Sequence, residues 1–412
     1  MGLGTWDLGL GSWELGVNKM KMSSTLLALP VAAGIAVGVA AQTPATQATA
    51  PPAGQTAAQA APAPTPLKPT GGRGLTEVHG IKVGQITLSE RPTGCTVILV
   101  DGEGVPGGVS QRGGAPGTRE TDLLDPLNMV DKVNAVVLAG GSAFGISAAE
   151  GTVRWLEERK IGWPVGASGV VPIVPAAILF DLGFGGKPTV RPTADCGYKA
   201  AAAATAGPVE EGNVGAGAGA TVGKMGGMAE HAGYPGGRRG PMKGGLGSYA
   251  ITLPNGLVVG AVVAVNAAGD IIDPDSGRVV AGARADDGRS LVDVRKMLRA
   301  GSLKAAGRPG ENTTIGVVAT NARLSKTEAN RLALMADDGF ARAIYPSHTP
   351  GDGDTVFALA TGSWHGEASV AVIGALAADV MAEAIVRAVS KAESLAGVPS
   401  AKELGTVPSR IK

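Results

Sequence analysis

The chain has 412 residues, a formal net charge of +1 and 44% hydrophobic residues, which indicates a globular protein with a sizeable core. A net charge this close to zero and an aromatic content of 3% exclude nucleic acid as the expected partner. The two cysteines, Cys95 and Cys196, are too few for a disulfide scaffold or a four-cysteine zinc site. The four histidines lack HExxH spacing, so we expect no metal ion and no other cofactor.

The first residues have the pattern of an export signal. Lys19 and Lys21 precede an uncharged run, rich in Ala, Val and Leu, that ends in small residues at Ala41. We expect a secretory signal over residues 1–41, of which residues 1–19 are a candidate spurious extension, and a periplasmic or secreted protein. A retained membrane anchor is the alternative. Proline and glycine interrupt the run and no basic cluster follows it, so we expect no stable membrane insertion after signal removal.

A low-complexity segment follows the signal. Residues 42–66 carry no charge and consist almost only of Ala, Pro, Gln and Thr. Such a composition cannot bury enough apolar surface to offset chain entropy, so we expect a disordered tether over residues 42–73. The folded domain is expected to occupy residues 74–412.

Short strands alternate with helices along this domain, which favours a mixed α/β architecture. Buried, β-branched runs predict strands at 96–100, 135–139, 247–253, 257–265, 314–320 and 356–360. Apolar periodicity and alanine content predict helices at 147–160, 198–206, 325–343 and 368–396. Ser325 and Glu328 have the spacing of a capping box at the start of the third helix.

Two glycine-rich segments do not fit well-known functional motifs. Residues 212–224 (GNVGAGAGATVGK) lack the spacing of both a phosphate loop and a dinucleotide fingerprint, which leaves a close-packed turn and a site loop as alternatives. Residues 140–145 (GGSAFG) resemble a nucleophile elbow, but Phe144 stands where its second glycine belongs. A serine hydrolase centred on Ser142 also lacks a suitably placed histidine.

Hydroxyl and carboxylate side chains precede two of the expected strands. Asn312 and Thr313 lie just before one strand, and Asp352 and Asp354 lie just before another. If these strand ends meet, a nucleophile and two carboxylates share one site. An Asp-Gly-Asp segment is also common in turns and cation loops, so the residues alone do not decide between these readings.

Several strings together carry a family resemblance over about residues 74–396. The most specific are RGGAPGTRETD at residues 112–122 and NTTIGVVATN at residues 312–321, joined by 140–145, 212–224 and 352–355. The chain resembles the self-cleaving N-terminal-nucleophile hydrolases that include the DmpA-type L-aminopeptidase/D-Ala-esterase, the β-peptidyl aminopeptidases and the 6-aminohexanoate-oligomer (nylon-oligomer) hydrolases. The resemblance implies a four-layer αββα sandwich, a single domain formed by two chains, 74–312 and 313–412, after self-cleavage.

The resemblance also implies roles for particular residues. Cleavage between Asn312 and Thr313 would free Thr313 as an N-terminal nucleophile, whose own α-amine serves as its base. Lys224 matches a lysine that lowers the pKa of this amine, and Asn266 matches a donor to the developing oxyanion. The acidic pair that orients the nucleophile and its amine corresponds to Asp352 and Asp354.

Further implications concern the pocket, the substrate and the assembly. Ser142 and Phe144 are expected to line the substrate pocket, where Phe144 replaces a tyrosine of some members. The substrate is a small peptide or an oligoamide, and the protein is expected to form a homo-oligomer, a tetramer of α/β heterodimers.

Structural readings of the same residues stay open. Asn266 could end a strand in a turn, Lys224 could be exposed after a glycine turn, and the string at 112–122 could pair Arg112 and Arg119 with Glu120 and Asp122. The competing functions are a secreted, uncleaved binding protein and an esterase centred on Ser142.

Overall fold

The computed structural model describes residues 72–226, 240–301, 312–367 and 369–411. The expected signal at 1–41 and nearly all of the expected tether lie outside these residues. The first described element is a 3-10 helix at Gly74–Glu77, close to the expected start of the domain.

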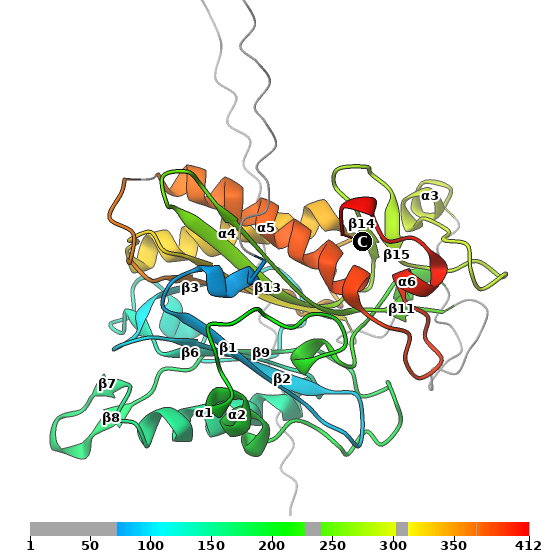
Figure 1. Ribbon diagram of the computed structural model, residues 1–412. Helices are drawn as coiled ribbons and strands as arrows, with labels where there is room; N and C mark the ends of the chain where they lie inside the picture. Colours follow the sequence, from blue (N-terminus) through cyan, green and yellow to red (C-terminus); the bar gives the residue numbers. More distant parts are fainter. Residues whose placement is uncertain (1–71, 227–239, 302–311, 368, 412) are drawn as a thin grey trace, which may run out of the picture. The chain divides into compact units, whose positions relative to one another are not determined.

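Two large β-sheets form the centre of the described chain (Figure 1). The first sheet has the order β1-β2-β6-β9-β4, with bounds Ile81–Thr87, Gly94–Val100, Ala135–Ala139, Ala176–Ile178 and Thr118–Arg119. The second has the order β12-β13-β16-β18-β3-β5, with bounds Gly245–Thr252, Val258–Asn266, Thr313–Thr320, Thr355–Ala360, Val105–Gln111 and Lys132–Val133. Smaller sheets contain β7 (Trp163–Pro164) with β8 (Val170–Val171), β10 (Thr221–Val222) with β11 (Met242–Lys243), and β14 (Asp270–Ile272) with β15 (Val279–Ala281) and β17 (Ile344–Tyr345).

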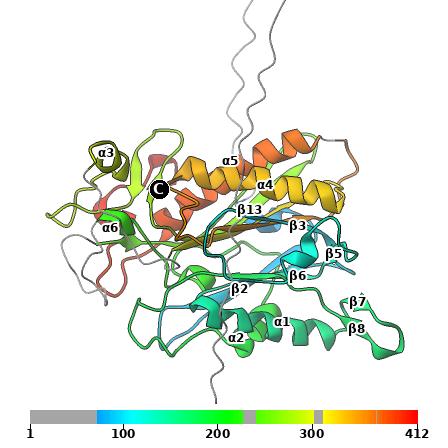
Figure 2. The same ribbon diagram turned by 180° about the vertical axis from the view of Figure 1, so that it is seen from behind.

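Helices cover the outer face of each large sheet, which gives four layers (Figures 1 and 2). On the first sheet lie α1 (Ala148–Glu157) and α2 (Ala194–Ala202), and on the second lie α4 (Lys326–Ala343) and α5 (Val370–Lys391). Two short helices, α3 (Val294–Arg299) and α6 (Ala401–Leu404), lie outside this frame. The arrangement is the αββα sandwich that the resemblance implied.

Alternation along the strands produces these layers, because successive strand side chains point to opposite faces. In β2, Val97 and Leu99 pack with the residues of α1 and α2, whereas Ile98 and Val100 pack between the sheets. In β18, Phe357 likewise packs between the sheets while its neighbours face α4 and α5. Each central strand is therefore buried on both faces, which explains the continuous apolar runs in the sequence.

Several helix boundaries differ from the expected ones, by up to five residues. Ser325 caps α4 with the expected capping box to Glu328. By contrast, α2 begins at Ala194, four residues before the predicted start, because its first turn lacks an apolar signal. The last long helix ends at Lys391, where Ala392 turns extended, well before the expected end at residue 396. No helix within the described ranges is long and apolar enough to span a membrane.

The two cysteines form a disulfide that the sequence analysis did not predict. Cys95 of β2 and Cys196 of α2 are bonded, with their Cα atoms 6.3 Å apart and a sequence separation of 101. The bond joins the first sheet to the helix layer that covers it.

The second sheet brings distant segments together at one edge. The strand β16 runs antiparallel to β13 and parallel to β18. Parallel strands begin at the same edge, so the start of β16 lies beside the segment that leads into β18. An isolated parallel bridge between Asn312 and Asp352 extends this pairing beyond the strands.

Candidate functional site

Thr313 begins β16 and lies directly opposite Asn266, the last residue of β13, in their antiparallel ladder. Both side chains are buried, with 3% and 1% of their surface exposed. Directly opposed residues of an antiparallel pair point to the same face with Cβ atoms about 5 Å apart. A hydroxyl and a carboxamide therefore lie within reach of the same small group.

The carbonyl between Asn312 and Thr313 has two donors at its oxygen. The Thr313 hydroxyl donates to this oxygen at 2.5 Å, and the Gly353 N–H donates to it at 2.9 Å. An N–O acyl shift needs a hydroxyl beside the carbonyl and a donor where negative charge develops, and both are present. A Cβ on Gly353 would lie 2.7 Å from Thr313 Oγ1, so glycine is required for this approach.

The Lys224 side chain is buried, with 2% exposed, so the reading of an exposed lysine after a glycine turn is wrong. Its Nζ donates to the side-chain oxygen of Asn266 at 2.9 Å and to the main-chain oxygen at 3.0 Å. Asn266 Oδ1 also accepts from Thr221 N at 3.0 Å, while Nδ2 donates to Phe180 O at 2.8 Å. An amide nitrogen carries two N–H bonds, so Asn266 can donate a second hydrogen bond to a ligand.

Asp352 joins this cluster through the bridge to Asn312. Its Oδ2 accepts from Thr349 N at 2.7 Å. Burial and the neighbouring charge of Asp354 raise the pKa of Asp352 to about 6, although hydrogen bonds from Thr349 and the charge of Lys224 lower it. The carboxyl of Asp352 therefore changes charge near pH 6, where a small change in its surroundings alters its protonation state at neutral pH.

Asp354 holds two backbone segments. Its Oδ1 accepts from Thr314 N at 2.8 Å, and its Oδ2 accepts from His348 N at 3.0 Å. The acidic pair thus flanks Gly353. In the parallel pairing that continues β16 and β18, Asp352 lies beside Asn312, so the acidic pair lies next to the Asn312–Thr313 bond. Of the residues predicted for catalysis, all five meet at this edge: Thr313, Asn266, Lys224, Asp352 and Asp354.

Two further ionisable residues lie behind Asp354, and the sequence analysis missed both. The His348 ring nitrogens lie 3.1 Å from Asp354 Oδ2 and 3.6 Å from Asp337 Oδ1. Burial works against a charged His348, but its contacts with Asp354 and Asp337 outweigh this and raise its pKa. Burial also raises the pKa of Asp337 to about 6, against a hydrogen bond of 2.7 Å from Ser110. No local pattern in the sequence connects either residue with the acidic pair.

The string RGGAPG packs its backbone against the acidic segment. Ala115 N donates to Asp352 O at 2.8 Å, and Arg112 N donates to Asp354 O at 3.3 Å. A Cβ on Gly113 would lie 2.3 Å from Asp352 O, so this glycine permits the contact. The specific string therefore fixes the position of the acidic pair.

The alternative in which Arg112 and Arg119 pair with Glu120 and Asp122 of this string is wrong. Arg112 lies 3.4 Å from Asp337 Oδ2 and also pairs with Asp338, and Arg119 pairs with Glu150 of α1. Glu120 has a left-handed φ of 56°, and its carboxylate accepts from Val174 N at 3.2 Å.

The two residues predicted to line the substrate pocket, Ser142 and Phe144, come directly after β6. Ser142 N donates to Leu179 O at 3.0 Å, and the next residue, Phe180, is the acceptor for Asn266 Nδ2. Among the described residues, no histidine or carboxylate hydrogen-bonds to the Ser142 hydroxyl, which leaves the Ser142-centred esterase without a base. Phe144 is 56% exposed. The guanidinium of Arg191 stacks on one face of its ring, 3.6 Å from the centroid.

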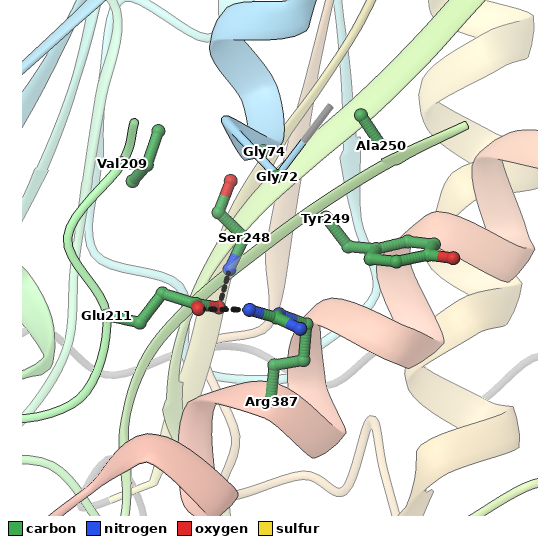
Figure 3. Close-up of a pocket in the computed structure, with 8 residues that line it drawn as sticks. All are labelled: Gly72, Gly74, Val209, Glu211, Ser248, Tyr249, Ala250 and Arg387. Atoms are coloured by element: carbon green, nitrogen blue, oxygen red, sulfur yellow. Dashed lines mark hydrogen bonds and ion pairs between the residues drawn. The ribbon is translucent and has the colours of Figure 1, made fainter. Parts of the chain in front are cut away.

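A separate pocket of about 210 Å³ lies beside β12 and α5 (Figure 3). The Glu211 carboxylate accepts from Ser248 N at 2.9 Å and from Arg387 Nε at 2.8 Å. The charges of Glu211 and Arg387 are therefore paired with each other, and neither is left for a ligand in this pocket. Its remaining lining residues are Gly72, Gly74, Val209, Tyr249 and Ala250.

No three His, Cys, Asp or Glu side chains in the described parts of the chain gather in a way that could hold a metal ion. The oxygens of Asp354 and one oxygen of Asp352 instead accept from backbone N–H groups.

Comparison with protein families and known proteins identifies relatives over most of the chain. The family described as peptidase family S58 matches residues 73–230 and 231–402. An uncharacterized aminopeptidase of Mycobacterium tuberculosis is 42% identical over 355 residues, which covers 80% of this chain and 97% of the relative. A 6-aminohexanoate-oligomer endohydrolase of Kocuria sp. is 32% identical over 340 residues, which covers 78% of this chain and 88% of the relative.

Solved structures show the same fold at lower identity. The L-aminopeptidase D-Ala-esterase/amidase of Ochrobactrum anthropi, described as a variant of the Ntn hydrolase fold, is similar with a TM-score of 0.60 and 22% identity, covering 83% of this chain and 94% of that one. A β-aminopeptidase of Burkholderia sp. is similar with a TM-score of 0.59 and 21% identity, covering 84% and 96%. The αββα sandwich is thus an Ntn-hydrolase fold.

Proposed function

The chain belongs to peptidase family S58 and is an amide hydrolase of the Ntn type, and from this premise we propose that it is a self-processing aminopeptidase or oligoamide hydrolase with Thr313 as nucleophile. The observation that carries this proposal is the carbonyl of Asn312, whose oxygen contacts both the Thr313 hydroxyl and the Gly353 N–H.

The proposed maturation is an N–O acyl shift followed by hydrolysis. Thr313 Oγ attacks the Asn312 carbonyl carbon and its proton passes to the departing nitrogen, so that the amide becomes an ester. Water then cleaves the ester and leaves a carboxylate on Asn312 and a free α-amine on Thr313. The Gly353 N–H stabilises the charge on the carbonyl oxygen during both steps.

The proposed turnover uses the same hydroxyl with a new base. The α-amine of Thr313 accepts the hydroxyl proton as oxygen attacks the substrate carbonyl, and Asn266 Nδ2 donates to the oxyanion. The amine of the substrate leaves with that proton, and water hydrolyses the acyl-enzyme. Lys224 disfavours protonation of the α-amine, and Asp352 and Asp354 orient it.

The fragment pattern tests the nucleophile. Purified protein should separate into two fragments, and the smaller should begin Thr-Thr-Ile-Gly, at residue 313. The variant Thr313→Val removes only the hydroxyl, so it should stay as one chain and lose amide hydrolysis.

Thr314→Val is the matched control, because it removes the adjacent hydroxyl from the same strand while keeping the N–H that donates to Asp354. It should cleave and hydrolyse as the wild type does. An active, uncleaved wild type, or an active Thr313→Val variant, would contradict the proposal. An inactive and uncleaved wild type would favour the competing binding-protein function.

The names of the relatives suggest the substrates to compare. We propose short linear amides with a free amino end, and p-nitroanilides of L-alanine, D-alanine, β-alanine and 6-aminohexanoate represent the candidate classes. The ratio of kcat/KM among the four identifies the preferred spacing between amine and scissile carbonyl. The proposed activity requires neither a nucleic acid nor a membrane as a partner.

We also propose export and self-association. The signal-like residues 1–41 and the disulfide between Cys95 and Cys196 support a periplasmic or secreted location, because disulfides persist in oxidising compartments. A homo-oligomer of cleaved α/β pairs is proposed from the family resemblance. The exposed side chains of Leu127 and Met129 support it, and light scattering on purified protein tests it.

A further inference from the structure

Lys243 is a second buried lysine near the site, and the proposed function gives it no role. Its side chain is 0% exposed, in the short strand β11. Its Nζ lies within hydrogen-bond distance of three main-chain oxygens: 2.8 Å from Ala220, 3.3 Å from Gly244 and 3.4 Å from Gly217. Burial lowers the pKa of Lys243 to about 7, although the charge of Asp181 raises it.

One peptide group connects this lysine to Asn266. The carbonyl oxygen of Ala220 accepts from Lys243, and the N–H of the same peptide, Thr221 N, donates to Asn266 Oδ1 at 3.0 Å. A donor on the oxygen of a peptide polarises its N–H and strengthens the hydrogen bond that the N–H makes. Lys243 is therefore linked to the carboxamide oxygen of Asn266, and not to the nitrogen that can donate to a ligand.

The orientation of Asn266 decides which of its groups faces the substrate. Its carboxamide oxygen must stay with Thr221 N and Lys224 for its nitrogen to donate outward. A loosened Ala220–Thr221 peptide would weaken one of these two anchors. Preorganised donors are effective because they need no reorientation during the reaction.

On the basis of the proposed function, we propose that Lys243 is a positioning residue that fixes the oxyanion donor Asn266 through the Ala220–Thr221 peptide. The alternative is that Lys243 only ties together three turns of the backbone. A fully buried amine is costly compared with an apolar side chain of similar size, so a purely structural role predicts that methionine replaces it without loss of turnover.

The test is a double-mutant cycle on cleaved enzyme, with rates expressed per free Thr313 N-terminus and the most active of the four p-nitroanilides as probe. Lys243→Met should lower kcat about tenfold with little change of KM, because the anchor matters mainly when the oxyanion forms. In an Asn266→Ala background the same change should lower kcat less than about twofold, since no donor remains to be positioned. Equal losses in both backgrounds, or no loss in the first, would overturn the proposal.

Thr96→Val is the matched control for a general loosening of this loop. Its buried hydroxyl accepts from Ala216 N at 3.1 Å in the same segment but does not touch the Ala220–Thr221 peptide. It should lower the melting temperature without changing kcat. A loss of kcat in Thr96→Val as large as in Lys243→Met would assign Lys243 a structural role.

Two readouts keep the test decisive. Self-cleavage should continue in Lys243→Met, because Gly353 N rather than Asn266 contacts the Asn312 carbonyl. If the methionine variant does not fold, Lys243→Gln keeps one donor for Ala220 and should lose kcat by a smaller factor in the same cycle. Failure of the proposed function is distinguishable, because it would appear as missing cleavage before Thr313 in the wild type.

Discussion

The Lys224 ammonium donates to both oxygens of Asn266, the side-chain oxygen at 2.9 Å and the main-chain oxygen at 3.0 Å. Asn266 in turn lies opposite Thr313, so the buried cation and the proposed N-terminal amine belong to neighbouring strands of one site. Lys224 also lowers the pKa of Asp352. A single buried cation therefore contacts the proposed oxyanion donor and acts on the charge of Asp352.

Replacement of Lys224 by alanine should slow hydrolysis and shift its pH dependence. Without the cation, the pKa of the Thr313 amine and that of Asp352 both rise, so the active protonation state forms only at higher pH. We expect a loss on the order of a hundredfold at pH 7 that is smaller at pH 9. The measurement is kcat/KM against pH on fully cleaved protein, with the melting temperature recorded beside it.

Lys82→Ala is the control for this prediction, because Lys82 is a partly exposed lysine that pairs with Asp101 on the surface. It should leave the pH profile unchanged. A cleaved Lys224→Ala enzyme with wild-type turnover and an unchanged profile would show that Lys224 is structural.

The acidic pair predicts the low-pH side of the activity profile. Burial and the charge of Asp354 raise the pKa of Asp352 to about 6, so kcat/KM should fall as the pH drops through about 6. Asp352→Asn should lower activity on the order of a hundredfold and remove most of this limb between pH 5 and 7.

Asp101→Asn serves as the control for the loss of one carboxylate, since it lies at the surface beside Lys82. An Asp352→Asn enzyme that kept a full acid limb near pH 6 would assign the limb to another group, such as the proposed Thr313 α-amine or His348, which lies beside Asp354.

The strands of this fold were predictable because each central strand is buried on both faces. The segment 135–139 was expected and matches β6, and the run after Thr313 matches β16. The strand β3 was missed, since Val105–Gln111 contains two glycines and little apolar pattern. Its Gly108 lies against the backbone of α4, where a Cβ would come 2.4 Å from Ala329 C. Such a contact between distant segments leaves no local signal.

The part of the site that could be predicted consists of residues that belong to short, recognisable sequence motifs. Thr313, Asp352 and Asp354 stand beside strand ends, and the fold joins those ends at one sheet edge. His348 and Asp337 reach the site through a loop and a helix face, so no spacing rule connects them. Lys243 was missed for a related reason, because the effect proposed for it depends on one peptide group, which hydrogen-bonds to both Lys243 and Asn266.

The buried carboxyl of Asp337 predicts how stability depends on pH. Its folded pKa of about 6 lies above the value of about 4 for an unfolded chain, so the folded state binds more protons between these values. The free energy of unfolding should therefore fall as the pH rises from about 4 to about 6, by at most about 3 kcal/mol from this group. Urea unfolding of the uncleaved Thr313→Val chain measures this slope, and Asp337→Asn should make it shallower.

Asp270 gives an independent comparison, because burial also raises its pKa to about 6 at a place distant in sequence from the acidic pair. Asp270→Asn should reduce the slope by a similar amount. If neither variant changes the slope between pH 4 and 6, these carboxyls do not titrate as their burial predicts.

Hydrolysis should not depend on a divalent metal ion. In the described parts of the chain, no three His, Cys, Asp or Glu side chains gather in a way that could hold a metal ion, and the proposed mechanism uses none. Full activity is expected after incubation with EDTA and desalting. Loss of activity that Mg²⁺, Ca²⁺ or Zn²⁺ restores would make Asp352 and Asp354 candidate ligands.

The disulfide predicts both the stability and the location of the protein. The bond between Cys95 and Cys196 closes a loop with a sequence separation of 101 residues, so its loss should cost about 3–5 kcal/mol of unfolding free energy. The double variant Cys95→Ala/Cys196→Ala should melt at a lower temperature and keep its turnover below that temperature, because neither cysteine contacts Thr313, Asn266 or Asp352 in the described structure.

The same bond makes export measurable in the native host. Protein from the periplasm or medium should resist alkylation by a maleimide until it is reduced, and should lack residues 1–41. Cytoplasmic protein would meet a reducing pool that keeps thiols free. Full-length chain with two alkylated cysteines in the cytoplasmic fraction would contradict export. A chain outside the cytoplasm that lacks residues 1–41 and has an oxidised disulfide would support both signal removal and export.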